Sequence, residues 1–309
     1  MAADNSDQEL AAVKAATLIE SLPWLKRYAG TVVVVKFGGN AMINDDLKRA
    51  FAEDMAYLRY AGLHPVVVHG GGPQISAALA QQGIESEFRG GYRVTSTEAI
   101  GVVRRVLADE VNKEIVDLIN EHSDGTHGPL AVGVFGDGPS LYSGQRKGVV
   151  VDGETFDLGH VGDITSVDPT SVLDVIRRGL IPVVSSIAAS DIDPAQALNV
   201  NADAAAGALA IALQAPKLVI LTDVPGLYSD WPNRDSLIGL ISVDELTELL
   251  PTLESGMIPK MTACLDAVVG GVGGATIIDG RIPHSILLEV FTQRGAGTEV
   301  IPNSRRNNQ

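Results

Sequence analysis

A lysine and two glycines directly follow a run of valines near the start of the chain. The segment TVVVVKFGGNA spans residues 31–41 and contains Lys36, Gly38 and Gly39. Four successive valines are typical of a strand that is buried on both faces, where a charged side chain is least expected. Lys36 either extends its ammonium into water at the end of this strand or delivers it to a cleft. The glycines favour a cleft that receives an anion, because they let a ligand approach the backbone closely.

A second glycine-rich turn follows the next apolar run. The segment HGGGP at residues 69–73 contains Gly71 and Gly72 and precedes a helical pattern. Free N–H groups at the start of a helix attract phosphate, so the two turns predict a phosphoryl-binding site. The alternative is that both turns serve packing alone. The chain contains neither GxxxxGK[ST] nor GxGxxG, which argues against a Walker-type NTPase and a standard Rossmann dehydrogenase.

Other charged and polar residues lie in loops that precede helical patterns. Arg93 occurs in GGYRVT, Asn199 and Asp203 occur in NVNADAAAG, and Lys260 follows SGMIP. A planar guanidinium in a glycine-hinged loop suits bidentate binding of a carboxylate, although a lone arginine is more often a surface residue. Asp203 either only stabilises the N-terminus of a helix through the helix dipole or holds lysine side chains in place. Lys260 offers a second cation.

The composition is that of an α/β protein. The 309 residues are 45% hydrophobic and 5% aromatic, a mixture typical of parallel sheets covered by helices. The formal net charge of −15 argues against a broad surface for nucleic acid or for an anionic membrane, but it allows a small basic pocket.

Cysteines and histidines give no sign of a metal site. Cys264 is the only cysteine, so neither an intrachain disulfide nor a cysteine-based zinc site can form. The histidines lack metal-ligand spacing, and we expect structural roles for them. They are His64, His69, His122, His127, His160 and His284. No apolar run reaches the roughly 18 residues of a membrane span, and the acidic N-terminus does not resemble a signal peptide, so we expect a cytoplasmic protein.

Strand and helix patterns alternate along most of the chain. Strands are predicted at 31–37, 64–69, 130–135, 180–186, 217–222, 275–279 and the terminal GTEVI. Helices are predicted at 8–29, 45–61, 73–82, 96–121, 169–178, 202–213, 242–250, 256–270 and 284–291. A glycine-punctuated section at 136–168 predicts antiparallel hairpins. This alternation indicates crossover connections and a mainly parallel sheet.

The chain is predicted to divide into an N-terminal helix and two halves. The helix lies within residues 1–30, with Pro23 as a kink or break. The weakest seam, SDIDPAQA at 190–197, separates residues 31–190 from residues 191–309. The apolar residues of the N-terminal helix either fold back on the body or pack against another subunit. They are Leu10, Val13, Leu18, Leu22 and Leu25.

Six motifs, in their order and spacing, resemble the amino acid kinase family and its acetylglutamate kinase branch. They are KFGGNAM, HGGGPQI, GYRVT, NVNADAAAGALA, LTDVPGLY and SGMIPKM. Lys-x-Gly-Gly is shared with aspartokinases, whereas HGGGPQI with GYRVT is specific to the acetylglutamate branch. The resemblance covers nearly the whole chain after the N-terminal helix. It implies an α/β fold of the amino acid kinase type, a three-layer αβα sandwich around a mainly parallel open sheet.

The same resemblance implies phosphoryl transfer from ATP to the side-chain carboxylate of N-acetyl-L-glutamate in arginine biosynthesis. Mg²⁺ would be carried on the nucleotide, with no metal site on the protein. The implied catalytic residues are Lys36, Lys260 and Asp203. The residues implied to bind the phosphoryl group and the acceptor carboxylate are Gly38, Gly39, Gly71 and Gly72. The residues implied to bind the rest of the substrate are Arg93 and Asn199. The residues implied to bind the nucleotide are Thr222, Asp223, Gly226, Tyr228, Ser255, Gly256 and Met257. Residues 31–190 would bind the amino acid, and residues 191–309 would bind ATP.

The two ends of the chain resemble the arginine-sensitive subset of the family. The resemblance rests on the N-terminal helix and on a C-terminal stretch with His284, Glu289, Gly295 and Gly297. It implies feedback inhibition by L-arginine and a hexamer built as a trimer of dimers. The alternative for residues 284–298 is an ordinary helix with a glycine C-cap.

Two other functions stay open. A related kinase would phosphorylate acetylaminoadipate or aspartate, although the absence of an appended regulatory domain disfavours an aspartokinase. A non-catalytic arginine-binding regulator would be expected to lack a catalytic residue, yet Lys36, Asp203 and Lys260 are all present.

Overall fold

The computed structural model describes residues 2–126, 128–138, 141–151 and 153–306, so His127 lies outside the described residues. Its centre is an eight-stranded sheet in the order β14-β16-β15-β11-β1-β2-β8-β5. Neighbouring strands are parallel except for the pair β15 and β16, which confirms the mainly parallel sheet. The strands are β1 (Val32–Phe37), β2 (His64–His69), β5 (Ala131–Val134), β8 (Ile181–Ser185), β11 (Lys217–Thr222), β14 (Leu240–Ser242), β15 (Ala275–Asp279) and β16 (Gly297–Ile301).

The alternation of side chains along β1 decides where Lys36 points. Val33 and Val35 belong to the hydrophobic cluster on one face of the sheet, and Val34 belongs to the cluster on the other. Because successive side chains of a strand point to opposite faces, Lys36 leaves the sheet on the same face as Val34. That face is covered by α7 (Ala202–Ala212), which contacts β1.

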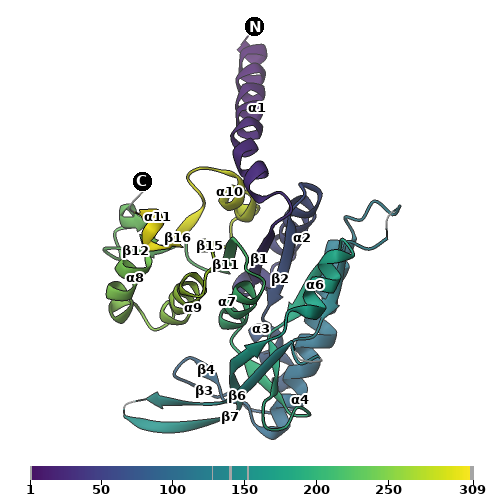
Figure 1. Ribbon diagram of the computed structural model, residues 1–309, viewed down its shortest axis with the longest axis vertical. Coiled ribbons are helices and arrows are strands. Elements are labelled where there is room, and N and C mark those ends of the chain that lie inside the picture. Colours follow the sequence, from purple (N-terminus) through teal and green to yellow (C-terminus); the bar gives the residue numbers. More distant parts are fainter. Residues whose placement is uncertain (1, 127, 139–140, 152, 307–309) are drawn as a thin grey trace.

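Helices cover both faces of the sheet, which confirms the three-layer architecture (Figure 1). On the face of Val33 lie α2 (Asp45–Tyr60), α3 (Gly72–Gln81), α4 (Thr97–Arg105), the π-helical turn η2 (Val106–Val111), α5 (Asn112–Asn120) and α10 (Ser285–Phe291). On the face of Val34 lie α6 (Thr170–Arg177), α7, α8 (Val243–Leu249) and α9 (Ile258–Val269).

A second sheet lies beyond the carboxyl ends of β1 and β2, at the bottom of Figure 1. It closes on itself in the order β10-β7-β6-β9, with β6 (Tyr142–Val151), β7 (Glu154–Val167), β9 (Ile187–Ser190) and β10 (Ala197–Val200). The antiparallel pair β6 and β7 confirms the hairpin predicted at 136–168. The sequence did not predict β9 and β10, which pair across the seam at 190–197 as a hairpin. The division of the chain at this seam stays a prediction.

The remaining elements are short. They are β3 (Phe88–Arg89), β4 (Tyr92–Arg93), β12 (Leu227–Tyr228), β13 (Leu237–Ile238), the 3-10 turns η1 (Gly39–Met42), η3 (Arg234–Ser236) and η4 (Leu250–Thr252), and α11 (Asn303–Arg306).

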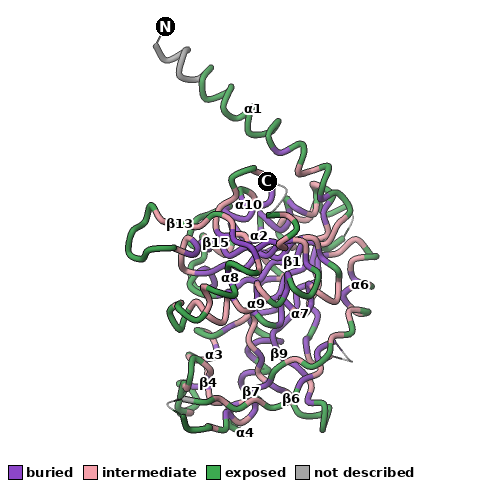
Figure 2. The backbone as a smooth tube through the Cα atoms, turned by 60° about the vertical axis from the view of Figure 1, so that its left-hand side comes forward, coloured by how far each residue is buried: buried purple, intermediate pink, exposed green. Residues whose placement is uncertain are grey.

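The N-terminal helix α1 (Ala2–Tyr28) projects from the body, and Pro23 lies inside it (Figures 1 and 2). Trp24 and Leu25 pack against the core, and Tyr28 is buried. The preceding turns do not fold back on the body, because their apolar residues are between 45% and 70% exposed. These residues are Leu10, Val13, Leu18, Ile19 and Leu22. No described helix is long and apolar enough to cross a membrane.

Candidate active site

A cavity of about 320 Å³ opens where β1 and β2 end. Parallel strands deliver the residues that follow them to the same edge of a sheet, which is why distant motifs meet here. The cavity brings together every residue that was predicted to be catalytic, phosphoryl-binding or substrate-binding. These residues are Lys36, Gly38, Gly39, Gly71, Gly72, Arg93, Asn199, Asp203 and Lys260.

The carboxylate of Asp203 lies between two ammonium groups. Its Oδ1 is 2.9 Å from Lys36 Nζ, and its Oδ2 is 3.2 Å from Lys260 Nζ. Asn201 fixes this position by capping α7, since its Oδ1 accepts the N–H groups of Asp203 and Ala204 at 2.8 and 3.1 Å. Lys36 therefore does not extend into water, and the alternative of a solvated lysine at the strand end is wrong.

Burial and the two lysines act on Asp203 in opposite directions. The residue is 3% exposed, and burial alone would raise the pKa of its carboxyl. The charges of Lys36 and Lys260 outweigh burial and hold the pKa of Asp203 below its ordinary value. Two ammonium groups and one carboxylate leave one positive charge on this cluster, and Arg93 adds another cation to the same cavity, which suits an anionic ligand.

The first glycine turn wraps around Lys36. A Cβ on Gly38 would lie 2.6 Å from Lys36 Nζ, so a side chain there would displace the ammonium. Gly39 has a φ of +74°, a conformation that favours glycine. The next residue, Asn40, donates its N–H to Asp223 Oδ1 at 3.1 Å. The turn is thereby tied to the end of β11.

Arg93, which also lines the cavity, is held by three hydrogen bonds. Its guanidinium donates to Ser86 Oγ at 2.5 Å, to Ser76 Oγ at 2.7 Å and to the Gly72 carbonyl at 3.1 Å. The residue is 8% exposed, and burial lowers the pKa of its guanidinium. The alternative of a lone surface arginine is therefore wrong.

Asn199 lines the cavity from β10 and is linked to Arg93 by hydrogen bonds. Its Nδ2 donates to Thr95 Oγ1 at 3.3 Å, and Thr95 Oγ1 donates to the Arg93 carbonyl at 3.0 Å. The amide of Asn199 and the backbone of Arg93 are thus linked through one hydroxyl, which sets two polar side chains on one side of the cavity.

A second cavity of about 490 Å³ adjoins the loop after β11. Of the predicted nucleotide residues, Asp223, Gly226, Tyr228 and Met257 line it. Thr222 is buried in β11, while Ser255 and Gly256 lie on an exposed turn outside the lining. Trp231 and Arg281 also line the cavity, although no sequence motif pointed to them. Trp231 contacts the Tyr228 ring with centroids 5.2 Å apart, and nothing local in the sequence signals this pairing.

A third cavity of about 870 Å³ lies between the foot of α1 and the body. Of the residues that were predicted to bind arginine, Glu289, Gly295 and Gly297 line this cavity, and Glu20, Arg27 and Arg294 are among its charged residues. His284 does not line this cavity. Its Nδ1 lies 2.7 Å from Asp54 Oδ1 on α2, and burial raises the pKa of Asp54 to about 6 although His284 acts to lower it.

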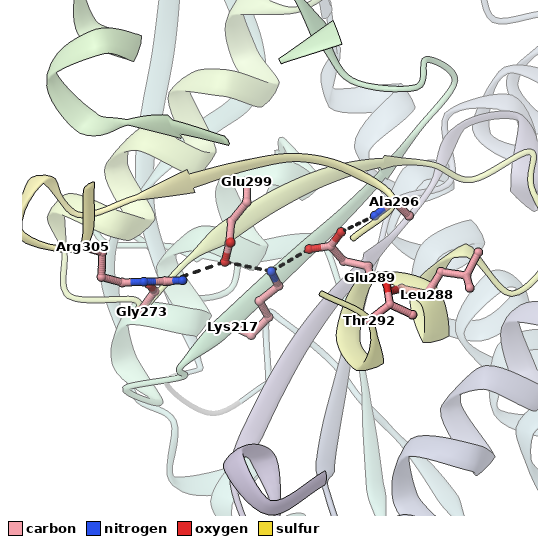
Figure 3. Close-up of polar contacts among 8 residues, drawn as sticks. All are labelled: Lys217, Gly273, Leu288, Glu289, Thr292, Ala296, Glu299 and Arg305. Atoms are coloured by element: carbon pink, nitrogen blue, oxygen red, sulfur yellow. Dashed lines mark hydrogen bonds and ion pairs between the residues drawn. The ribbon is translucent and has the colours of Figure 1, made fainter. Parts of the chain in front are cut away.

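Lys217, the first residue of β11, lines this third cavity, and its ammonium lies between the carboxylates of Glu289 and Glu299 (Figure 3). Its Nζ lies 2.7 Å from Glu289 Oε1 and 3.0 Å from Glu299 Oε1. Burial would lower the pKa of Lys217, but the two carboxylates raise it above its ordinary value. No sequence motif pointed to this lysine, because a charge at the first residue of a strand is ordinary and its partners come from distant segments.

We expect Asp203→Asn to lower the free energy of unfolding by about 3–5 kcal/mol at pH 7, because the buried Lys36 ammonium and the partly exposed Lys260 ammonium lose their counter-ion. The pKa of Asp203 is lower in the folded state, so its contribution is present above about pH 4 and is lost as pH falls through the folded-state pKa. In urea unfolding, the difference in the free energy of unfolding between the wild type and Asp203→Asn should therefore be smaller below pH 4 than at pH 7. Asp174→Asn, which changes an exposed ion pair with Arg177, is the control, and an equal effect there would contradict the prediction.

Comparison with known proteins agrees with this geometry. Residues 31–279 match the model of the amino acid kinase family. The acetylglutamate kinase of Leifsonia xyli subsp. xyli (strain CTCB07) is 64% identical over 299 residues, which cover 97% of each chain. The acetylglutamate kinase of Clavibacter michiganensis subsp. michiganensis (strain NCPPB 382) is 64% identical over 296 residues, which cover 96% of each chain.

Solved structures share the fold at lower identity. The N-acetylglutamate synthase from Neisseria gonorrhoeae, complexed with coenzyme A and N-acetyl-glutamate, has a TM-score of 0.78 at 24% identity, over 93% of this chain and 63% of that chain. The carbamate kinase from Giardia lamblia bound to AMP-PNP has a TM-score of 0.64 at 16% identity, over 89% of this chain and all of that chain. The family model and the nearly full-length relatives show that this chain belongs to the amino acid kinase family and, within it, to the acetylglutamate kinases.

Proposed function

We propose that the protein transfers the γ-phosphoryl group of ATP to the side-chain carboxylate of N-acetyl-L-glutamate. The products are ADP and the acyl phosphate N-acetyl-L-glutamyl 5-phosphate, in a step of arginine biosynthesis. Support comes from relatives called acetylglutamate kinase that match almost the whole chain. The observation that carries the proposal is the Asp203 carboxylate between Lys36 and Lys260 in the first cavity.

The chemistry requires charge neutralisation rather than a general base. A glutamate side chain has an ordinary pKa of about 4.3, so the attacking carboxylate is already ionised at neutral pH. Its oxygen forms a bond to the γ-phosphorus while the bond from that phosphorus to the β,γ-bridging oxygen breaks. Lys36 would neutralise charge from the acceptor side and Lys260 from the nucleotide side, with Asp203 holding both.

Each half of the chain would bind one of the two ligands. Arg93 and Asn199 would bind the α-carboxylate and the acetamido group of N-acetyl-L-glutamate, with backbone N–H groups of the glycine turns on the phosphoryl group and the acceptor. The second cavity would receive the adenine and ribose. Closure of residues 31–190 on residues 191–309 would exclude water from an acyl phosphate that hydrolyses readily.

Mg²⁺ would accompany the nucleotide. Among the described residues, no group of three histidine, cysteine, aspartate or glutamate side chains could hold a metal ion, and Asp203 is already paired with two lysines. A nucleotide-bound Mg²⁺ needs few protein ligands because it keeps several waters. It would supply further neutralisation of the phosphate oxygens.

The acceptor and the two lysines can be tested in one assay of ADP release. With Mg-ATP, we expect turnover with N-acetyl-L-glutamate and not with aspartate or acetylaminoadipate. Lys36→Ala and Lys260→Ala should each lower kcat by about 10²- to 10³-fold, because charge on the transferring group loses a partner. Lys113→Ala, at a 71% exposed side chain, is the control. Full turnover by either cavity variant would contradict the mechanism, and turnover on another acceptor would favour the related kinases.

We also propose that L-arginine inhibits the enzyme by binding in the third cavity. A guanidinium needs a carboxylate partner and an α-carboxylate needs a cation, and this cavity offers Glu20, Glu289 and Glu299 together with Lys217, Arg27 and Arg294. The cavity lies against α1, so bound arginine would act on the position of this helix relative to the body.

Arginine should therefore slow the turnover of the full chain. Glu289→Gln should raise the arginine concentration for half-inhibition at least 10-fold, because a charge-assisted hydrogen bond is lost. Glu98→Gln, on the exposed side of α4, is the matched control, and each rate is compared with the uninhibited rate of the same variant. An unchanged response in Glu289→Gln would place arginine elsewhere, and no inhibition of the wild type would remove the regulatory proposal.

The exposed apolar residues of α1 would pack against another copy of the chain, in a hexamer built as a trimer of dimers. The double variant Leu18→Glu and Ile19→Glu should sediment as a smaller species, because charges enter an apolar helix contact. Lys14→Glu on the same helix is the control. Sedimentation velocity showing one size for all three proteins would contradict this assembly.

A further inference from the structure

His69 is a fully buried titratable group that the proposed mechanism does not use. It is 0% exposed and is the last residue of β2, directly before the glycines that line the first cavity. Its Nδ1 lies 2.9 Å from the carbonyl oxygen of Gly70, and its Nε2 lies 3.0 Å from Asn112 Nδ2. The sequence analysis expected only a structural role for this residue.

The partners of His69 fix its tautomer. A carbonyl oxygen can only accept, so Nδ1 carries the proton and donates to Gly70. The same Asn112 amide donates to the Val183 carbonyl at 2.8 Å, which requires nitrogen rather than oxygen at this end of the amide. Nε2 therefore accepts from Asn112 and carries no proton. Burial supports this neutral state, because it lowers the pKa of His69 to about 4.

The rest of the fold supports this arrangement. The π-helical turn η2 ends immediately before Asn112 and presents Leu107 to the glycine loop, where a Cβ on Gly71 would lie 2.8 Å from it. A Cβ on Gly133 in β5 would meet Asn112 Oδ1 at 2.2 Å, so the absence of a side chain there makes room for the amide. Single-turn π-helical insertions often occur at functional sites.

The hydrogen bond from His69 sets the direction of the next peptide group. In a trans peptide the C=O and the following N–H point in opposite directions. The Gly70 carbonyl faces the buried imidazole, so the Gly71 N–H points away from it. No acceptor in the described part of the chain pairs with that N–H, and Gly71 lines the cavity that also contains Lys36 and Lys260.

We propose that His69 is a positioning residue that, held by Asn112, turns the Gly71 N–H toward the transferring phosphoryl group. The imidazole touches neither substrate and acts only through the orientation of the Gly70–Gly71 peptide. This inference rests on the proposed kinase function, because it assigns the N–H to the phosphoryl group of that reaction.

The tautomer can be tested in the wild-type protein without an activity assay. With ¹⁵N-labelled histidine, long-range ¹H–¹⁵N spectra should show one ring with a protonated Nδ1 and an unprotonated Nε2 that does not titrate between about pH 5 and 8. His69→Asn identifies this ring by the loss of its signals. A protonated Nε2, or titration of this ring in that range, would overturn the proposal.

The positioning role can be tested by kinetics. His69→Leu removes the donor and should lower kcat by about 10- to 100-fold, while the KM values for ATP and N-acetyl-L-glutamate change less than about 3-fold. Affinity for ADP with aluminium fluoride, a mimic of the transferring group, should fall by the same factor as kcat. His69→Asn places an amide N–H near Nδ1 and should restore most of the rate.

The controls separate this proposal from the function on which it rests. His64→Leu changes the other end of β2 and should leave kcat unchanged. If His69→Leu turns over as fast as the wild type, the positioning role is wrong and the kinase function still stands. The same conclusion follows if His69→Leu loses kcat but binds the aluminium fluoride complex as tightly as the wild type. A wild type that releases no ADP would overturn the kinase function instead, while the tautomer measurement would still stand. If His69→Leu does not fold, the tautomer spectrum and the rate of His69→Asn decide the question.

Discussion

The contact on which the site depends is one buried carboxylate between two ammonium groups. Without Asp203 the ammonium groups of the buried Lys36 and the partly exposed Lys260 would repel each other, because like charges at short range are unfavourable away from bulk water. With Asp203 present the three groups keep one net positive charge, which suits an anionic ligand. The requirement reaches far into the fold, since β1, α7 and α9 must each deliver one of these residues to the same point.

The parallel sheet meets this requirement through the common direction of its strands. β1 and β2 end at the first cavity, and β11 runs beside β1 from Lys217 at the third cavity to Thr222 just before the second. Asp223, the residue after β11, accepts the Asn40 N–H from the glycine turn of β1. This one strand therefore runs between the proposed arginine site and the proposed nucleotide site, and the residue after it is hydrogen-bonded to the glycine turn that follows β1.

Both glycine turns pack closely against neighbouring side chains. Gly38 leaves room for the ammonium of Lys36, and Gly71 leaves room for Leu107. His69 and Asn112 fill the space beneath the second turn with a satisfied pair of hydrogen bonds. Loops with small residues are mobile in water, whereas phosphoryl transfer gains most from N–H groups that are already in place before the ligand arrives.

The sequence by itself determined the class of fold and most of the first cavity. Apolar periodicity is local, so the strands and helices of the main sheet could be predicted. A charge such as Lys36 at the end of a valine run is also a local feature, and it could be picked out as a candidate site residue before the fold was known. The short strands β9 and β10 could not be predicted, because their pairing partners rather than their own sequence make them strands. Tertiary structure alone decided that His284 meets Asp54 instead of the third cavity, that Lys217 is buried between Glu289 and Glu299, and that His69 meets Asn112. Each of these contacts joins segments far apart in the chain, and no local pattern encodes which distant side chain a buried polar group will find.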